Sequence, residues 1–345
     1  MKAVRPVPEE VFLQLLQHAC LPEDEVVTLL QKAMDPAYWE KLNPSLSVGG
    51  QLADGVRETA TLGLQNRSEL LEKLGREGYF QTGPLLSESL VGRMRACIEV
   101  LRKEHWPPVF AFVYDQFWQV ARIPPLVELL SGALGPGYKQ NSNSWCHYIP
   151  PRSGSAGWGP HMDGFNRSNR LSIWIPLSDA TLQNGCMYVI PQHVVPETLR
   201  DFSTLENVSR AELQTLLQGS RAVPAQAGSV LGWHFQLIHW GSTVAQAEHA
   251  RISLTMEFVG DQAEPKTDEH PLFEGHAALP TFPQRLHVIG KGILDYERFE
   301  LRLIRYRELA KRLVDRVGRF GGPPGMASSP SVDAPGPNLQ DRNAG

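Results

Sequence analysis

A change of texture after Tyr138 is the feature of this sequence that most constrains its fold. From there on, short runs of β-branched and aromatic residues alternate with clusters of Gly, Pro, Asn and Ser, which is the pattern of strands joined by turns. Their spacing favours an antiparallel barrel or sandwich over alternating βαβ units. The predicted strands are 140–149, 170–177, 185–191, 228–235 and 251–259.

Helices are predicted around this β region because apolar residues recur there at helical spacing. Ser68 and Ser87 stand where a side chain caps the start of a helix. Residues 34–65 are rich in turn residues and are predicted to form an extended arm. Residues 321–345 hold five Gly and five Pro, so a disordered tail is predicted there. The predicted helices are 8–33, with a break at Pro22, then 68–77, 87–103, 124–134, 206–218 and 296–317.

Composition excludes several classes of protein. The 345 residues include 33 Lys and Arg against 37 Asp and Glu, a net charge of −4. Binding to nucleic acid by charge needs a basic excess, so no nucleic-acid partner is expected. No apolar run reaches the length of about 18 residues that spans a membrane. Polar residues and prolines interrupt the first 20 residues, where a signal peptide would be apolar, and a cytoplasmic protein is therefore expected.

The chemistry-bearing motif is His161-Met162-Asp163. On a strand, residues two apart point to the same face, so this spacing lets an imidazole and a carboxylate converge on one metal ion. A hydrogen-bonded His–Asp pair on a surface turn is the alternative.

A third ligand is predicted at His239, at the end of the apolar stretch SVLGWHFQLIHWGS. Two imidazoles and one carboxylate form the facial triad of non-haem Fe(II) oxygenases, which leaves coordination positions open. A 2-oxo acid fills two of them and dioxygen the third. If the acid is 2-oxoglutarate, its distal carboxylate needs a cation, and Arg251 on the next predicted strand suits a bidentate pair. A surface ion pair is the alternative for Arg251.

Residues 78–259 resemble the phytanoyl-CoA dioxygenase family of Fe(II)- and 2-oxoglutarate-dependent oxygenases. Gly78-Tyr79-Phe80, followed by a capped helix, is similar to that family's N-terminal opening. The other matching stretches are Trp158-Gly-Pro-His161-Met-Asp163-Gly, Leu171-Ser-Ile-Trp174-Ile-Pro-Leu-Ser-Asp179, Asn184-Gly185-Cys-Met-Tyr-Val-Ile-Pro191, Gly228-Ser-Val-Leu-Gly-Trp-His234, Leu237-Ile-His239 and the strand that Arg251 begins.

The resemblance implies a mainly β fold with flanking helices (α+β), whose core is a double-stranded β-helix, or jelly roll. Residues 1–77 lie outside the resemblance and are predicted to form an N-terminal helical and extended extension, before an oxygenase domain with flanking helices over 78–320.

The resemblance also implies roles for single residues. It implies that Fe(II) is bound by His161, Asp163 and His239, and that Arg251 binds 2-oxoglutarate. Trp174 matches a position that lines the cosubstrate pocket. The family's His-Gly-Ser is replaced here by the longer His239-Trp240-Gly241-Ser242. Ser242 is therefore assigned the family serine's contact with the 2-oxoglutarate carboxylate only by analogy.

Further contacts to substrate are predicted from the strand 140–149. Asn143, Trp145 and His147 share one face by the two-residue period, and that face is predicted to point into the barrel. The Gly- and Ser-rich loop before Trp158 is predicted to act as a lid. A buried polar stripe and a plain surface loop are the alternatives.

We therefore expect a dioxygenase that hydroxylates a small molecule and releases succinate and CO2. The carboxylate of Asp163 favours hydroxylation over halogenation, because halogenases of this family have a small residue there. The alternatives are a cupin-like metalloenzyme without 2-oxoglutarate, a zinc hydrolase, and a non-catalytic jelly-roll binding module. The substrate and the oligomeric state are not predicted.

Overall fold

The computed structural model describes residues 7–50, 63–164, 168–195, 209–263, 273–275 and 279–318. The predicted tail 321–345 lies outside the described residues. The helices are α1 (Glu9–Ala19), α2 (Glu23–Met34), α3 (Pro36–Leu42), α4 (Leu64–Glu77), α5 (Glu88–Lys103), α6 (Gln116–Gln119), α7 (Pro124–Leu134), α8 (Arg210–Gly219), α9 (Phe282–Tyr296) and α10 (Arg307–Gly318).

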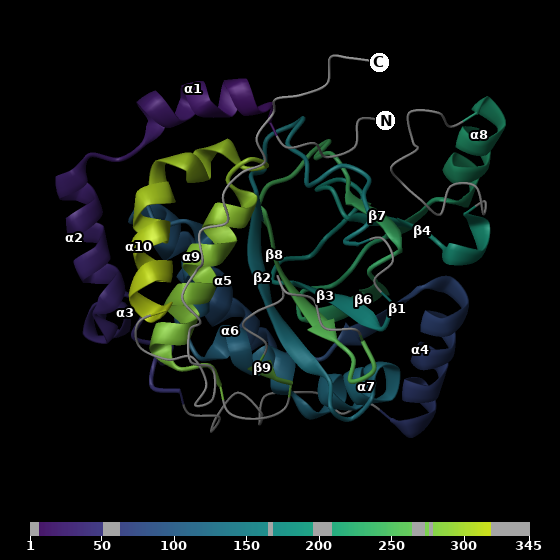
Figure 1. The fold of residues 1–345 in the computed structure, drawn as a ribbon. Coiled ribbons are helices and arrows are strands. Elements are labelled where there is room, and N and C mark those ends of the chain that lie inside the picture. The colour runs from purple at the N-terminus through teal and green to yellow at the C-terminus, as the bar shows by residue number, and fades with distance from the viewer. Residues whose placement is uncertain are drawn as a thin grey trace, which may run out of the picture.

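Two antiparallel sheets form the centre of the molecule, with helices around them (Figure 1). The larger sheet has the strand order β1-β6-β3-β8-β2-β9, and the smaller has the order β5-β4-β7. The strands are β1 (Tyr79–Pro84), β2 (Lys139–Ile149), β3 (Arg170–Pro176), β4 (Met187–Ile190), β5 (Arg221–Val223), β6 (Ser229–His234), β7 (Ile238–Gly241), β8 (Arg251–Val259) and β9 (Phe273–Glu274).

Every residue of β3 is buried, because both faces of the larger sheet are covered. On one face, Trp174 and Trp233 pack with Met187 and Val189 of the smaller sheet in one apolar cluster. On the other face, side chains of β2, β3 and β8 join the main core with α5, α7 and α9. Fold class is therefore as predicted at the level of mixed helix and antiparallel sheet.

Helix α9 packs against β2 and runs beside α10 (Figure 1). Two interior glycines permit these approaches. A Cβ on Gly290 would lie 2.8 Å from the carbonyl oxygen of Ala310 in α10, and one on Gly292 would lie 3.3 Å from the ring of Trp145 in β2. The last residue of α9 is Tyr296, which reaches the cavity described below.

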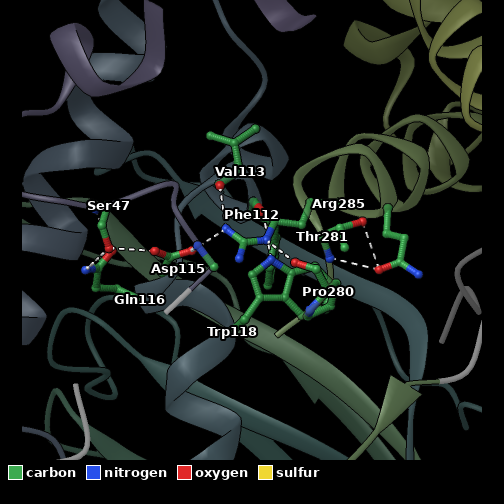
Figure 2. A network of polar contacts seen from close by, with 11 residues as sticks. Ser47, Phe112, Val113, Asp115, Gln116, Trp118, Pro280, Thr281 and Arg285 are labelled. Carbon is green, nitrogen blue, oxygen red and sulfur yellow. Dashed lines mark hydrogen bonds and ion pairs between the residues drawn. The ribbon is translucent and has the colours of Figure 1, made fainter. Parts of the chain in front are cut away.

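A buried ion pair holds the other end of α9 (Figure 2). Arg285 Nη1 lies 2.6 Å from Asp115 Oδ1, and the two side chains are 0% and 1% exposed. The guanidinium also donates to the carbonyl oxygens of Val113 and Pro280, at 2.9 and 2.8 Å. The carboxylate accepts from Ser47 Oγ at 2.7 Å. The pair thus joins α9 to two earlier segments of the chain.

Two predictions of local structure in the N-terminal part of the chain were wrong. Ser68 is not the N-cap of helix α4. The helix begins at Leu64, with Gly63 as its N-cap, so residues 64–67 are helical and Ser68 lies inside the helix. The predicted extended arm 34–65 contains α3, which Asp35 caps by accepting from the Ala37 amide at 3.0 Å. The buried Trp39 anchors this helix.

The predicted single helix 296–317 was also wrong. Its first part is a 3₁₀ helix (Leu301–Tyr306), and only α10 is α-helical there. Helix α9 was not predicted, although Thr281 and Gln284 form a capping box at its start. By contrast, Ser87 caps α5 as predicted, accepting from the Leu90 amide at 3.1 Å.

In the described part of the chain, no helix has both the length and the apolar character needed to span a membrane. The cytoplasmic location and the boundaries 1–77 and 78–320 stay predictions. The N-terminal extension does contact the C-terminal helices: the Val7 amide donates to the Arg298 carbonyl at 3.0 Å, and the Leu21 amide to that of Arg305 at 3.2 Å.

Candidate metal centre and active site

The three predicted ligands meet at one point. Ligand atoms of His161, Asp163 and His239 all lie within 4.8 Å of one another. Asp163 Oδ1 is 3.5 Å from Nε2 of each histidine. His239 lies on β7, whereas His161 forms only an isolated antiparallel bridge with His239. The motif therefore sits in an extended loop rather than on a regular strand as predicted, and backbone pairing with β7 replaces the strand as the positioning element.

Backbone carbonyls orient both imidazoles. His161 Nδ1 lies 2.7 Å from the Gly159 oxygen, and His239 Nδ1 lies 3.0 Å from the Leu237 oxygen. A carbonyl oxygen only accepts, so each Nδ1 carries the proton and each Nε2 presents a lone pair to the centre. Such outer contacts fix the tautomer and orientation of metal-binding histidines.

Two donors orient the carboxylate of Asp163. Ser172 Oγ donates to Oδ2 at 2.5 Å, and Trp233 Nε1 donates to the same oxygen at 2.8 Å. Oδ1 is thereby left as the oxygen that faces both imidazoles. The arrangement offers one oxygen and two nitrogens to a single ion, with the rest of its coordination sphere open to the cavity.

The protonation states of His239 and Asp163 also suit a metal. Burial lowers the pKa of His239 to about 4, so this imidazole is neutral near pH 7. Burial opposes ionisation of Asp163, but His239, His161 and Ser172 outweigh it and hold the pKa of this carboxyl well below its usual range. Neutral imidazole and carboxylate are the donor forms that bind Fe(II).

Arg251, at the start of β8, is 3% exposed and lies in the same cavity. The alternative of a surface ion pair is therefore wrong. Nη1 lies 3.7 Å from Met187 Sδ, and Nε has no hydrogen-bond partner among the described residues. Two glycines cradle the guanidinium: a Cβ on Gly157 or Gly241 would lie 2.8 or 2.9 Å from Nη2. Burial lowers the pKa of Arg251 to about 10, because the buried cation has no anion beside it to stabilise its charge.

Ser253, two residues along β8, carries a second such atom. Its side chain is fully buried and lines the cavity, and its Oγ has no partner among the described residues. A buried polar group without a partner is costly. Arg251 and Ser253 together therefore fit an absent anionic ligand with several oxygens, such as a carboxylate.

The cavity has a volume of about 60 Å³. Of the predicted contact residues, Trp174, Trp145, His147 and Trp158 line it. His147 Nε2 lies 3.0 Å from Thr255 Oγ1, and burial together with nearby Arg251 lowers its pKa to about 3. Of the three β2 residues predicted to face inward, Trp145 and His147 thus line the cavity.

Two predicted contact residues are not brought into the cavity lining. Asn143 instead donates to Glu257 Oε2 at 3.0 Å, so it supports a lining residue. Ser242 follows the lining residue Gly241, and its amide donates to the Cys186 carbonyl at 3.0 Å. The inserted Trp240 shifts the serine past the position that faces the guanidinium.

Several lining residues were missed by sequence reasoning. Ser253, Thr255 and Glu257 alternate along β8 after Arg251, so the two-residue period could have found them. Trp233 could have been found by its place in the apolar stretch before His239. Nothing in the local sequence marks Tyr296, which lines the cavity from the end of α9.

The loop before Trp158 is tied to the chain after β7. Ala156 pairs with Thr243, the Gly154 amide donates to the Val244 carbonyl at 3.0 Å, and the Val244 amide donates to Ser155 at 2.7 Å. These bonds hold the backbone of the predicted lid. Trp158, at its end, packs its ring 5.7 Å from that of His161.

Comparisons with solved structures give partial similarities. The non-haem α-ketoglutarate-dependent epimerase SnoN from nogalamycin biosynthesis is 20% identical, with 63% of this chain and 94% of that chain covered and a TM-score of 0.49. The non-haem monooxygenase ThoJ is 16% identical, with 71% and 100% covered and a TM-score of 0.47. EctD from S. alaskensis is 17% identical, with 66% and 92% covered and a TM-score of 0.46.

No curated protein sequence gives a significant match. The sequence model of the phytanoyl-CoA dioxygenase family, in contrast, matches residues 102–253. This segment contains the three candidate ligands and Arg251. Enzymes of this family use Fe(II), 2-oxoglutarate and dioxygen on small molecules. The matched segment, which carries the candidate site, is therefore similar to the phytanoyl-CoA dioxygenase family of 2-oxoglutarate-dependent oxygenases, as its motifs predicted.

Proposed function

We propose that this protein is a dioxygenase that hydroxylates a small-molecule substrate at an iron held by His161, Asp163 and His239. The observation that carries the proposal is the buried guanidinium of Arg251, whose Nε has no partner in the described chain. It shares one cavity with the three candidate ligands. The distal carboxylate of 2-oxoglutarate would give this group its missing partner.

Each residue has a defined task in this proposal. The Nε2 atoms of His161 and His239 and Oδ1 of Asp163 hold the metal. Ser172 and Trp233 keep Oδ1 turned toward it. Iron with 2-oxoglutarate and dioxygen supplies the oxidising chemistry, and succinate and CO2 are the products of the cosubstrate.

Arg251 and Ser253 bind the distal carboxylate of 2-oxoglutarate. The guanidinium offers paired N–H donors that match a carboxylate, and the serine hydroxyl adds a third donor beside it. Ser253 takes the part that the family resemblance gave to Ser242. Trp174 lines the cavity and excludes water from the carboxylate–guanidinium pair. Exclusion of water strengthens the attraction between the two charges.

We also propose that the two sheets form a double-stranded β-helix. Trp174 and Trp233 of the larger sheet pack against Met187 and Val189 of the smaller sheet, and the candidate site lies between the sheets. A site in the mouth of such a barrel is a common place for small ligands.

Anaerobic titration with Fe(II) and then 2-oxoglutarate tests the cofactor assignment. The chelate is expected to give a weak visible charge-transfer band. His161→Ala should abolish the band. Arg251→Ala should leave iron binding intact and raise the 2-oxoglutarate concentration needed for the band at least tenfold. Arg251→Lys should need a concentration between those of the wild type and Arg251→Ala, because lysine keeps the charge but loses the paired N–H donors. Iron binding without any band in the wild type would favour the cupin-like alternative.

Hydroxylation is tested by the product. A hydroxylated product gains one oxygen atom from dioxygen, whereas epimerisation or ring closure leaves the product without that atom. Mass spectrometry under labelled dioxygen separates these reactions once a substrate is known.

A further inference from the structure

An aromatic wall faces the iron site from the end of α9. Tyr296 packs between Trp145 and Trp158, with ring centroids 4.6 and 4.9 Å apart. Trp158 also stacks on Phe299, at 5.9 Å and an interplanar angle of 29°. Trp145, Trp158 and Tyr296 all line the cavity. Tyr296 lies outside residues 102–253, so the family match does not assign it.

The wall is held rigidly. Trp145 Nε1 donates to Glu300 Oε1 at 3.1 Å, and Glu300 Oε2 accepts from Arg302 Nη2 at 2.7 Å. Glu297 pairs with Arg307 next to it. These contacts fix the segment that follows α9, and with it the position of the Tyr296 ring.

The hydroxyl of Tyr296 is available to a ligand. No hydrogen bond to it is found among the described residues, although the residue lines the cavity. Burial, with Glu257 and Asp163 nearby, raises its pKa well above the usual range. The group therefore stays protonated and can donate a hydrogen bond.

The charges of the described lining disfavour an anion. Arg251 is its one Lys or Arg, and it is committed to 2-oxoglutarate in the proposed function. Asp163 is committed to the metal. The charged group left toward the substrate side is Glu257, a carboxylate that accepts from Asn143. Apart from the metal, a substrate anion would meet no uncommitted Lys or Arg of the described lining to offset its desolvation.

We propose that this cavity binds a flat, ring-containing substrate that carries no anionic group, and that Tyr296 positions it by a hydrogen bond from its hydroxyl. The proposal rests on the proposed function, because the iron and 2-oxoglutarate define where the substrate lies. Aromatic rings in offset or edge contact supply favourable geometry for such a ring, and a cation on it would be stabilised by the same faces.

The test uses three probes with one ring system: tryptamine, indole-3-acetamide and indole-3-acetate. Each is titrated calorimetrically, without dioxygen, into the full-length protein loaded with Fe(II) and 2-oxoglutarate, while the visible band is recorded. Tryptamine and indole-3-acetamide should bind, and indole-3-acetate at least tenfold more weakly than its amide isostere. Tyr296→Phe should weaken amide binding about five- to tenfold, the loss of one hydrogen bond, with the band unchanged.

Tyr188→Phe is the matched control, because Tyr188 stacks on Trp240 at 5.4 Å and does not line the cavity. It should leave all three affinities unchanged. Equal binding of the anion, failure of all probes to bind, or an amide affinity unaffected by Tyr296→Phe would each overturn the inference while the band stands. Absence of the band in the wild type would overturn the proposed function instead, and this inference with it.

Discussion

Trp233 Nε1 donates a hydrogen bond of 2.8 Å to Oδ2 of Asp163, and so turns the other carboxylate oxygen toward both candidate histidines. The indole lies on β6, while the carboxylate lies in the loop before β3. The bond therefore links the larger sheet to the metal-binding loop. Ser172 holds the same oxygen from β3.

Trp233→Phe should weaken Fe(II) binding about tenfold, because removal of an outer-shell partner costs about 10–100-fold in metal affinity and Ser172 remains. The dissociation constant is measured anaerobically by competition with a chelator. Trp118→Phe is the control: Trp118 is also fully buried, and its Nε1 donates to the Phe112 carbonyl at 2.7 Å, outside the cavity lining. Similar iron affinity in the two variants would contradict the role of Trp233.

Gly241→Ala should weaken 2-oxoglutarate binding at least tenfold and leave iron affinity unchanged. The new Cβ would lie 2.9 Å from Arg251 Nη2 and 3.1 Å from Gly157 Cα, so the guanidinium must move from its cradle. The Fe(II)·2-oxoglutarate band, titrated with cosubstrate, reports the change. Gly75→Ala, where a Cβ meets nothing within 4 Å, should titrate like the wild type.

Two of the three candidate ligands could be proposed from local spacing, because His161 and Asp163 lie two residues apart. His239 could be proposed because it lies at the end of a strongly apolar stretch. Arg251 could be placed because a strand follows. The prediction of Ser242 came from a family pattern that the inserted Trp240 breaks. The two-residue period along β8 puts Ser253 on the same face as Arg251, which is why Ser253 is proposed here instead.

Tyr296 could not be predicted, because its place depends on tertiary packing. Helix α9 contains Gly290 and Gly292, and glycine inside a helix counts against helix formation by about 1 kcal/mol. In the structure these glycines let α10 and Trp145 approach the helix closely. The two glycines that count against a helix in the sequence are thus the residues that let α9 pack beside the site.

The buried Arg285–Asp115 pair should dominate the stability of the packing around α9 (Figure 2). Asp115→Ala leaves the guanidinium buried without its counter-ion, and about 3–5 kcal/mol of unfolding free energy should be lost. Urea unfolding followed by circular dichroism measures it. Asp295→Ala removes the exposed partner of Lys291, 3.0 Å away, and should cost no more than about 0.5 kcal/mol. Comparable losses in the two variants would show that burial of the first pair is unimportant.

His147 should make the metal-free protein less stable in acid. Its pKa is about 3 in the folded protein, because burial and Arg251 disfavour the imidazolium, against an ordinary value of 6.5. Below pH 6.5 the unfolded chain therefore binds a proton at this residue that the folded protein does not, and stability falls as the pH is lowered from 6.5 toward 3. The slope from one such group is at most about 1.4 kcal/mol per pH unit.

Urea unfolding between pH 7 and 4 should show that the free energy of unfolding of His147→Gln depends less steeply on pH than that of the wild type. An unchanged slope in His147→Gln would mean that this imidazole is protonated in the fold.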